Sequence, residues 1–297
     1  MKPNPTLKKL GYSNSDRLVI IHTDDIGVSH ASVQAFSDLW DFGIISSGAT
    51  MVPCSWFSQV GAYCRAHPSV DMGVHLTLTS EWEGYRWRPL STCDPSSGLI
   101  DDEGYFYRDE TVVQERADAE AAKTETQAQV TQALKAGVDV THIDTHMGTV
   151  AHPKFISAYV QLALEHKLPP MILRLDEAGY QKIGMDSETA SFAAQFVVKL
   201  EEMGLPLLDH IFQMSLDQHS DRIDQVKNTL SEIPSGITHF IIHPSVDTPE
   251  LRALTPDWPS RVADYQAFMS EDLKKWIINS GIQVIGYRPL REVMRKV

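Results

Sequence analysis

The chain has 297 residues, of which 42% are hydrophobic, and it carries a formal net charge of −13 at pH 7. This length is ample for a substantial core, and we expect one domain that spans residues 1–297. The negative charge opposes binding to nucleic acid phosphates and to anionic membrane surfaces. A small molecule is therefore the expected partner, and the composition is compatible with a homo-oligomer.

Three cysteines, Cys54, Cys64 and Cys93, form no metal-binding spacing and no inferable pair. They indicate a reduced, cytoplasmic setting. Residues 1–5 are followed by polar residues without the apolar stretch of a secretory signal, and no apolar run approaches the roughly 18 residues of a membrane span.

Apolar runs alternate with longer helical patterns along the chain. The expected strands are 18–23, 46–52, 72–78, 140–144, 171–174, 207–210, 238–242 and 282–285. The expected helices are 30–42, 55–66, 110–136, 153–167, 188–203, 221–231, 261–279 and 289–295. This alternation predicts an α/β fold with a parallel sheet, most simply a distorted, TIM-like (β/α) barrel of seven or eight strands. A doubly wound open sheet is the alternative.

Asp24 and Asp25 follow the first strand directly, within Thr-Asp-Asp-Ile-Gly at 23–27. Neighbouring residues of a strand point to opposite faces, so one carboxylate could bind a metal while the other acts as a base. The alternative is a turn in which one aspartate caps the next helix. That helix is expected to begin after Ser29 and to end at Gly43.

His75 lies in Gly-Val-His-Leu-Thr-Leu at 73–78, where it is either a metal ligand or a hydrogen-bonded core residue. The segment 80–109 that follows has no clear periodicity but contains six aromatic residues near its ends. Long loops within compact domains are usually functional or disordered, and this many aromatic residues argue against disorder. Trp82 and Trp87 could contact a ligand or pack the loop.

His142, Asp144 and His146 alternate, so an extended strand places all three on one face. A polar face on a buried strand favours a functional site over a structural role. Arg174 and His243 also follow expected strands. Arg174 could orient a carboxylate or simply pair with one, and His243 could be a general acid or a turn residue before proline. Together, ionisable residues at five strand ends favour a metal site, because such carboxyl ends meet at one edge of a parallel sheet.

Three blocks, 23–27, 73–78 and His-Ile-Asp-Thr-His at 142–146, resemble the signature motifs of the YdjC-like carbohydrate deacetylase family (the ChbG/HpnK group). Arg174, His243-Pro244, Arg261 and residues 285–288 are similar as well, so the resemblance covers nearly the whole chain. The chain departs from the family's usual pattern at Ser245, where glycine is common, and at Asp264, where glutamate is commoner.

The resemblance implies a distorted (β/α) barrel that hydrolyses the amide of an N-acetylated sugar. It implies Asp25, His75 and His146 as ligands of one divalent metal, Asp24 as the catalytic base and His243 as the acid. Mixed nitrogen and oxygen ligands favour Zn²⁺, although Mg²⁺ or another divalent ion would also be accepted. Substrate contacts are expected from the following residues: Trp82, Trp87, Arg174 and Arg261.

Two other functions remain open on the sequence alone. A glycoside hydrolase would use paired carboxylates, but it would give His75 and His146 no role. A non-catalytic sugar-binding barrel would bind no metal and would tolerate the change Asp24→Asn.

Overall fold

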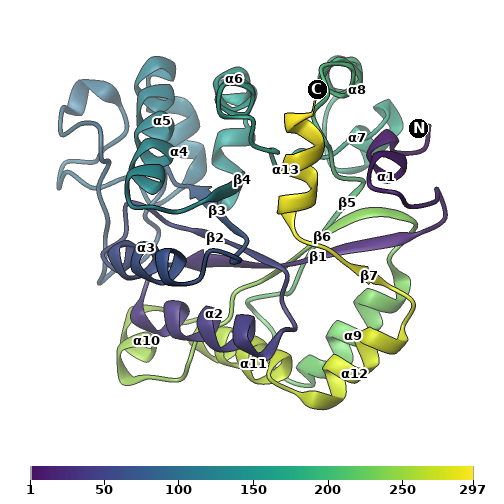
Figure 1. Cartoon of the computed structure of the whole chain (residues 1–297). Helices are drawn as coiled ribbons and strands as arrows, with labels where there is room; N and C mark the ends of the chain where they lie inside the picture. Colours follow the sequence, from purple (N-terminus) through teal and green to yellow (C-terminus); the bar gives the residue numbers. More distant parts are fainter. Residues whose placement is uncertain (1, 297) are drawn as a thin grey trace.

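A computed structural model describes residues 2–296 and shows an α/β fold whose parallel strands are surrounded by helices (Figure 1). The strands are β1 (Arg17–Ile26), β2 (Ser47–Thr50), β3 (Met72–Leu76), β4 (Val140–Thr145), β5 (His210–Gln213), β6 (Gly236–Ile242) and β7 (Gln283–Val284). The α-helices are α1 (Pro5–Lys9), α2 (His30–Phe42), α3 (Phe57–Ala66), α4 (Glu110–Arg116), α5 (Ala119–Lys135), α6 (Ile156–His166), α7 (Glu177–Lys182), α8 (Ser187–Glu202), α9 (Arg222–Glu232), α10 (Pro249–Leu254), α11 (Trp258–Phe268), α12 (Glu271–Asn279) and α13 (Tyr287–Arg295). Two 3₁₀ helices, η1 (Pro95–Ser97) and η2 (His146–Ala151), complete the elements of the described chain.

The sheet has the strand order β4-β3-β2-β1-β6-β5, and β7 pairs with the start of β1. The segment 169–174 bridges its two edges. The Met171 amide donates to the carbonyl of Ile143 in β4, and the Arg174 amide donates to the carbonyl of Leu208, just before β5. The α/β fold with a parallel sheet is therefore confirmed, and single bridges rather than a full strand link β4 to β5.

Alternate residues of β1 pack into two different apolar clusters. Leu18 and Ile20 contact the smaller cluster that includes Tyr287, whereas Val19 and Ile21 belong to the larger cluster under the helices. Because side chains alternate along a strand, His22 and Asp24 continue the face of Leu18 and Ile20. On this face of β1, the apolar residues Leu18 and Ile20 therefore come first, and the polar residues His22 and Asp24 lie nearer the carboxyl end of the strand.

Most helix boundaries agree with the sequence. The expected helix 30–42 is α2, with Ser29 as its N-cap and Gly43 in a left-handed conformation at its end. The expected helix 110–136 is divided because Asp118 caps α5, and 261–279 is divided because Ser270 caps α12. The expected strand 171–174 is reduced to isolated bridges, since Pro169 and Pro170 cannot donate backbone hydrogen bonds.

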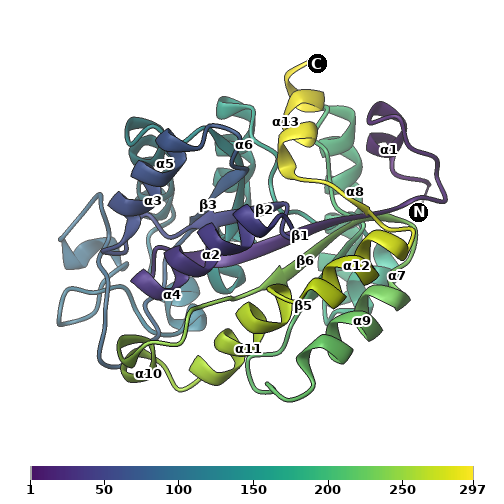
Figure 2. The same ribbon diagram turned by 60° about the horizontal axis from the view of Figure 1, so that its bottom comes forward.

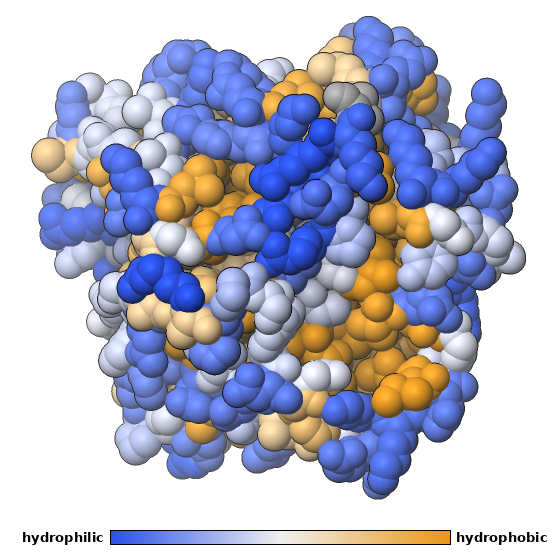
Figure 3. Space-filling view, in the orientation of Figure 1, coloured by the Kyte–Doolittle hydropathy of each residue, from blue (hydrophilic) through white to orange (hydrophobic). Residues whose placement is uncertain are grey.

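The helices pack around the strands in both ribbon views, and α9, α11 and α12 lie side by side (Figure 2). On the face seen in Figure 3, apolar side chains reach the surface in the region of β7 and α12, where Ile278 and Val284 are exposed. None of the described helices combines the length and the apolar character that crossing a membrane would require.

Candidate active site

Asp25, His75 and His146 converge at the carboxyl ends of β1, β3 and β4. The Nδ1 atom of His146 lies 3.2 Å from Oδ1 of Asp25 and 3.3 Å from Nε2 of His75, and the latter lies 3.5 Å from the same Oδ1. In a tetrahedral site with ligands about 2.1 Å from the metal, neighbouring ligand atoms are about 3.4 Å apart. The three side chains therefore have the spacing of a tetrahedral metal's ligands.

The backbone at Asp25 explains how two adjacent aspartates reach one site. Asp25 has a φ of 60°, and the pairing of β1 with β2 shifts register between Thr23 and Ile26. This left-handed conformation is rare for residues other than glycine and is typical of functional positions. It turns the side chain of Asp25 to the same region as that of Asp24, which the regular alternation of a strand would not allow.

Arg261 of α11 orients Asp25. Its Nη1 donates to Oδ2 of Asp25 at 2.7 Å, while Asp257 accepts from its Nε and Nη2. Burial would raise the pKa of Asp25, but Arg261 and the nearby imidazoles outweigh burial and hold it well below its usual value. Oδ1 is buried and has no partner with hydrogen-bond geometry among the described residues. An ionised, unpartnered oxygen that faces two imidazoles fits a cation site.

A carboxylate lies behind each imidazole. Oδ1 of Asp144 is 2.8 Å from Nδ1 of His75, and Oε2 of Glu81 is 3.0 Å from Nε2 of His146. Burial lowers the pKa of His146, but Glu81 and Asp25 raise it to about 9 overall. These contacts leave Nε2 of His75 and Nδ1 of His146 facing Asp25. The carboxylates behind the two rings favour a cation between these three side chains.

Asp24 lies beside this group without being part of it. Its Oδ1 is 2.7 Å from Nδ1 of His22, and its Oδ2 faces Nε2 of His75 at 3.7 Å and Nε2 of His243 at 3.9 Å. Burial would raise its pKa, but His75, the hydrogen bond from His22 and His243 lower it below the usual value. Asp24 is thus an ionised carboxylate next to the candidate metal ligands.

His243 follows β6 and is held through its backbone. Its amide donates to Oδ2 of Asp264, which also pairs with Arg222. Its ring nitrogen Nδ1 is buried and has no hydrogen-bond partner within residues 2–296. Burial lowers the pKa of His243, and Asp25 and Asp24 offset this only in part. The ring is therefore neutral near pH 7 and faces Asp24.

Trp82 and Trp87 line the site from the loop that follows β3, and both are buried. Trp82 packs against the Arg261 guanidinium at 5.4 Å and against Trp87 at 5.9 Å. The indole of Trp87 donates to the carbonyl of Thr79 at 2.7 Å. The two rings form a wall beside the candidate metal ligands, with Trp87 6.4 Å from the ring of His146, and stacking on a sugar stays a prediction.

Arg174 does not join this cluster. Its guanidinium pairs with Glu201 and Asp209 and donates to the carbonyl of Lys2. Because Asp209 and the bridge to Leu208 precede β5, Arg174 lies near the amino ends of the strands. This placement does not support the expectation that Arg174 contacts substrate. Arg174 instead pairs with carboxylates, which is the alternative that the sequence left open.

Sequence reasoning missed several residues of the site. Glu81 carries no signal, because it lies in an irregular loop. Asp144 was recognised in the alternating pattern but not as the partner of His75. His22, two residues before Asp24 on the same strand face, could have been found from that spacing.

The chain is similar to several known proteins. The family model described as YdjC-like protein matches residues 18–279. A carbohydrate deacetylase of Thermus thermophilus is 31% identical over 97% of this chain and 98% of its own, and one of Thermoanaerobacter pseudethanolicus is 22% identical over 93% and 100%. A crystal structure of an Enterococcus faecalis protein, to which cellobiose-phosphate cleavage has been ascribed, superimposes with a TM-score of 0.73 at 20% identity. It covers 93% of this chain and 99% of that one and supports the fold.

Proposed function

Because the chain belongs to the YdjC-like protein family, we propose that it is a metal-dependent carbohydrate deacetylase that removes the acetyl group from an N-acetylated sugar or oligosaccharide. The names of its relatives support the reaction and the substrate class. The observation that carries the metal dependence is the buried Oδ1 of Asp25, which has no hydrogen-bond partner in the described part of the chain and faces Nε2 of His75 and Nδ1 of His146.

Asp25, His75 and His146 would hold one divalent cation, and their mixed oxygen and nitrogen atoms favour Zn²⁺ over Mg²⁺. Such an ion would polarise the acetyl carbonyl and lower the pKa of the attacking water. Three protein ligands are what a catalytic zinc site uses, since further positions must stay open for water and substrate.

Asp24 is the proposed base. The oxygen of a water molecule bonds to the carbonyl carbon of the acetyl group, the π electron pair of the C=O bond moves to the carbonyl oxygen, and Oδ2 of Asp24 accepts one of the water's protons. The low pKa of Asp24 keeps it ionised before this step. Its Oδ1 is already used by His22, so Oδ2 is the oxygen available for the reaction.

His243 is the proposed acid. Because its ring starts neutral, it must receive a proton during turnover before it can give one. Asp24 is the proposed donor of that proton, since its Oδ2 lies 3.9 Å from Nε2 of His243. His243 then protonates the sugar nitrogen as the carbon–nitrogen bond breaks, which releases acetate and a free amino sugar.

The glycoside hydrolase alternative fits this site less well. Such an enzyme needs one carboxyl group whose pKa is raised so that it can act as an acid. Asp24 and Asp25 instead both have lowered pKa values, and each is bound to a basic partner, His22 or Arg261.

Acetate release from a panel of N-acetylated mono- and oligosaccharides by the Zn²⁺-loaded protein tests this function. We expect release from at least one sugar, and a loss of about 10²–10⁴-fold in Asp24→Asn, the range typical of a general base. Asp24→Asn should keep its bound metal. Absence of acetate release across the panel, or equal activity in a folded Asp24→Asn protein, would contradict the proposal; the former is also what a non-catalytic barrel predicts.

A further inference from the structure

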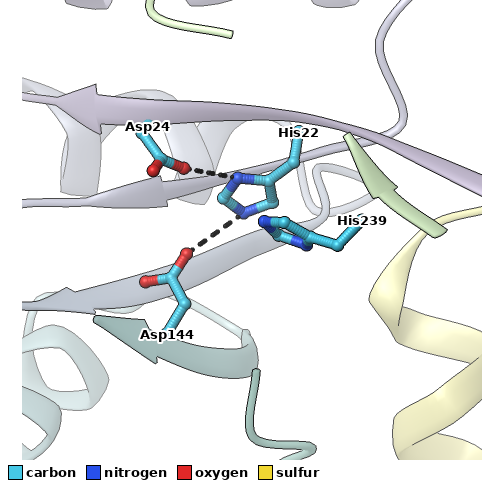
Figure 4. A group of neighbouring side chains, drawn as sticks. All are labelled: His22, Asp24, Asp144 and His239. Atoms are coloured by element: carbon cyan, nitrogen blue, oxygen red, sulfur yellow. Dashed lines mark hydrogen bonds and ion pairs between the residues drawn. The ribbon is translucent and has the colours of Figure 1, made fainter. Parts of the chain in front are cut away.

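A second group of ionisable side chains lies directly beneath the candidate metal ligands. His22, Asp24, Asp144 and His239 come from β1, β4 and β6 and point towards one another in the interior (Figure 4). All four are buried, and His22, Asp144 and His239 have no exposed surface. Burying this many polar groups is costly unless they serve one another as partners.

His22 is the centre of this group. Its Nδ1 lies 2.7 Å from Oδ1 of Asp24, and its Nε2 lies 3.4 Å from Oδ2 of Asp144 (Figure 4). The same Nε2 lies 2.9 Å from Nε2 of His142. The ring of His142 in turn occupies the space where a side chain at residue 73 would be, since a Cβ added to Gly73 would lie 2.4 Å from its Cε1. The imidazole of His22 is thus fixed from both ends.

The distances favour a hydrogen-bonded network over a second metal site. The 2.7 Å separation between His22 and Asp24 is that of a strong hydrogen bond, and it is shorter than the roughly 3.4 Å between neighbouring ligands of a tetrahedral metal. A carboxylate oxygen accepts and an imidazole N–H donates, so the contact assigns Nδ1 of His22 as the donor and Oδ1 of Asp24 as the acceptor. Both nitrogens of His22 are therefore already in use.

We propose that His22 is a positioning residue, which holds Oδ1 of Asp24 so that Oδ2 faces the reacting water and His243. This inference rests on the proposed function, in which Asp24 is the base. Without the bond from His22, the carboxylate could rotate about its side chain and turn towards His75, whose Nε2 is already 3.7 Å from Oδ2. A misplacement of the Asp24 carboxylate by about 1 Å would be enough to lower the rate about 10²-fold.

The test compares two substitutions at residue 22. His22→Leu keeps an apolar side chain of moderate size but has no donor, whereas His22→Asn keeps a donor at about the position of Nδ1. We expect kcat of His22→Leu to fall about 10–100-fold with KM unchanged, and His22→Asn to recover most of the loss. Zn²⁺ affinity should stay within about twofold in both, because Oδ1 of Asp144, the oxygen that bonds His75, is not the oxygen that faces His22. A wild-type kcat in His22→Leu, or equal losses in the two variants, would overturn the proposal.

Two controls separate positioning from damage to the fold. His239→Leu alters an equally buried ring that bonds Tyr287 instead of Asp24, so it should lower thermal stability without the same loss of kcat. In an Asp24→Asn background, adding His22→Leu should cost little further activity, because the group that His22 orients is no longer a base. Fully additive losses would contradict the proposal.

A third arm needs no substrate and so separates this inference from the proposed function. In the metal-free protein, the Nδ1 proton of His22 should give a downfield proton NMR resonance that Asp24→Asn shifts upfield. An unmoved resonance would show that His22 does not donate to Asp24. If this resonance behaves as expected but no sugar is deacetylated, the proposed function fails while the bond between the two residues stands.

Discussion

Oδ1 of Asp144 lies 2.8 Å from Nδ1 of His75, and this contact decides which nitrogen of the imidazole faces the candidate metal position. Oδ1 of Asp144 accepts the Nδ1 proton, which leaves the lone pair of Nε2 directed at Asp25. Both side chains are buried, so water does not compete for the bond.

Asp144→Asn should therefore weaken metal binding although Asp144 is not itself a ligand. We expect Zn²⁺ affinity to fall about 10–100-fold, the usual effect of removing a carboxylate behind a ligating histidine. Competition with a chromophoric chelator measures this directly, alongside a thermal melt that reports folding. An affinity within about twofold of wild type in a folded protein would contradict the assigned orientation of His75.

Glu81 should act on His146 in the same way but more weakly. Its side chain is 25% exposed, whereas that of Asp144 is fully buried, so solvent screens its charge. We expect Glu81→Gln to reduce Zn²⁺ affinity by less than Asp144→Asn does. Glu83→Gln, two residues away on the surface, is the matched control and should leave the affinity unchanged. Equal affinities in the two glutamine variants would remove Glu81 from the site.

Trp82 and Trp87 should contribute to the stability of the fold, and Trp82 should also affect substrate binding. Trp82 and Trp87 are buried, so each change to alanine should lower the free energy of unfolding by about 3–5 kcal/mol. Trp82→Ala should also raise KM, because Trp82 packs on the Arg261 that orients Asp25. Chemical denaturation and steady-state kinetics check both parts, and wild-type stability in either variant would show that the rings do not form the wall described.

The ion pairs of helix α13 should make the free energy of unfolding depend on pH in the acid range. Arg291 and Arg288 bond Asp139, which precedes β4, and the hydrogen bond from Arg291 is the main reason that the pKa of Asp139 falls from 3.8 to about 2. A lowered folded-state pKa stabilises the protein above pH 3.8, and this stabilisation is lost as the pH falls towards 2.

Asp139→Asn should accordingly be less stable than wild type at pH 6, with the difference shrinking as the pH is lowered through 3. The effect should be modest, because Asp139 is half exposed. Urea unfolding across this pH range measures it. A stability difference that stays constant with pH would mean that the ion pair contributes nothing through the charge of Asp139.

The sequence predicted the fold well wherever local signals agree with the tertiary structure. Helix α2 was predicted to the residue, because Ser29 and Gly43 supply both of its ends. The segment 171–174 was taken for a strand from its apolar residues, although the two prolines before it prevent a regular ladder. Periodicity alone cannot distinguish these cases.

The candidate site was predictable where ionisable residues follow strands in regular alternation, as His142, Asp144 and His146 do. It was not predictable where the tertiary structure decides the placement. No local sequence signal predicts the left-handed backbone conformation of Asp25. Glu81 contacts His146 only through the tertiary arrangement of the loop after β3. Arg174 follows an apolar run like the others, but that run lies beside the amino end of β5.

The most direct test of the account is a Zn²⁺ titration of the metal-free protein, wild type beside His146→Ala. We expect one ion to bind tightly per wild-type chain and tight binding to be lost in the variant, because His146 is one of only three proposed protein ligands. An unchanged stoichiometry and affinity in folded His146→Ala would contradict the metal site and, with it, the proposed chemistry.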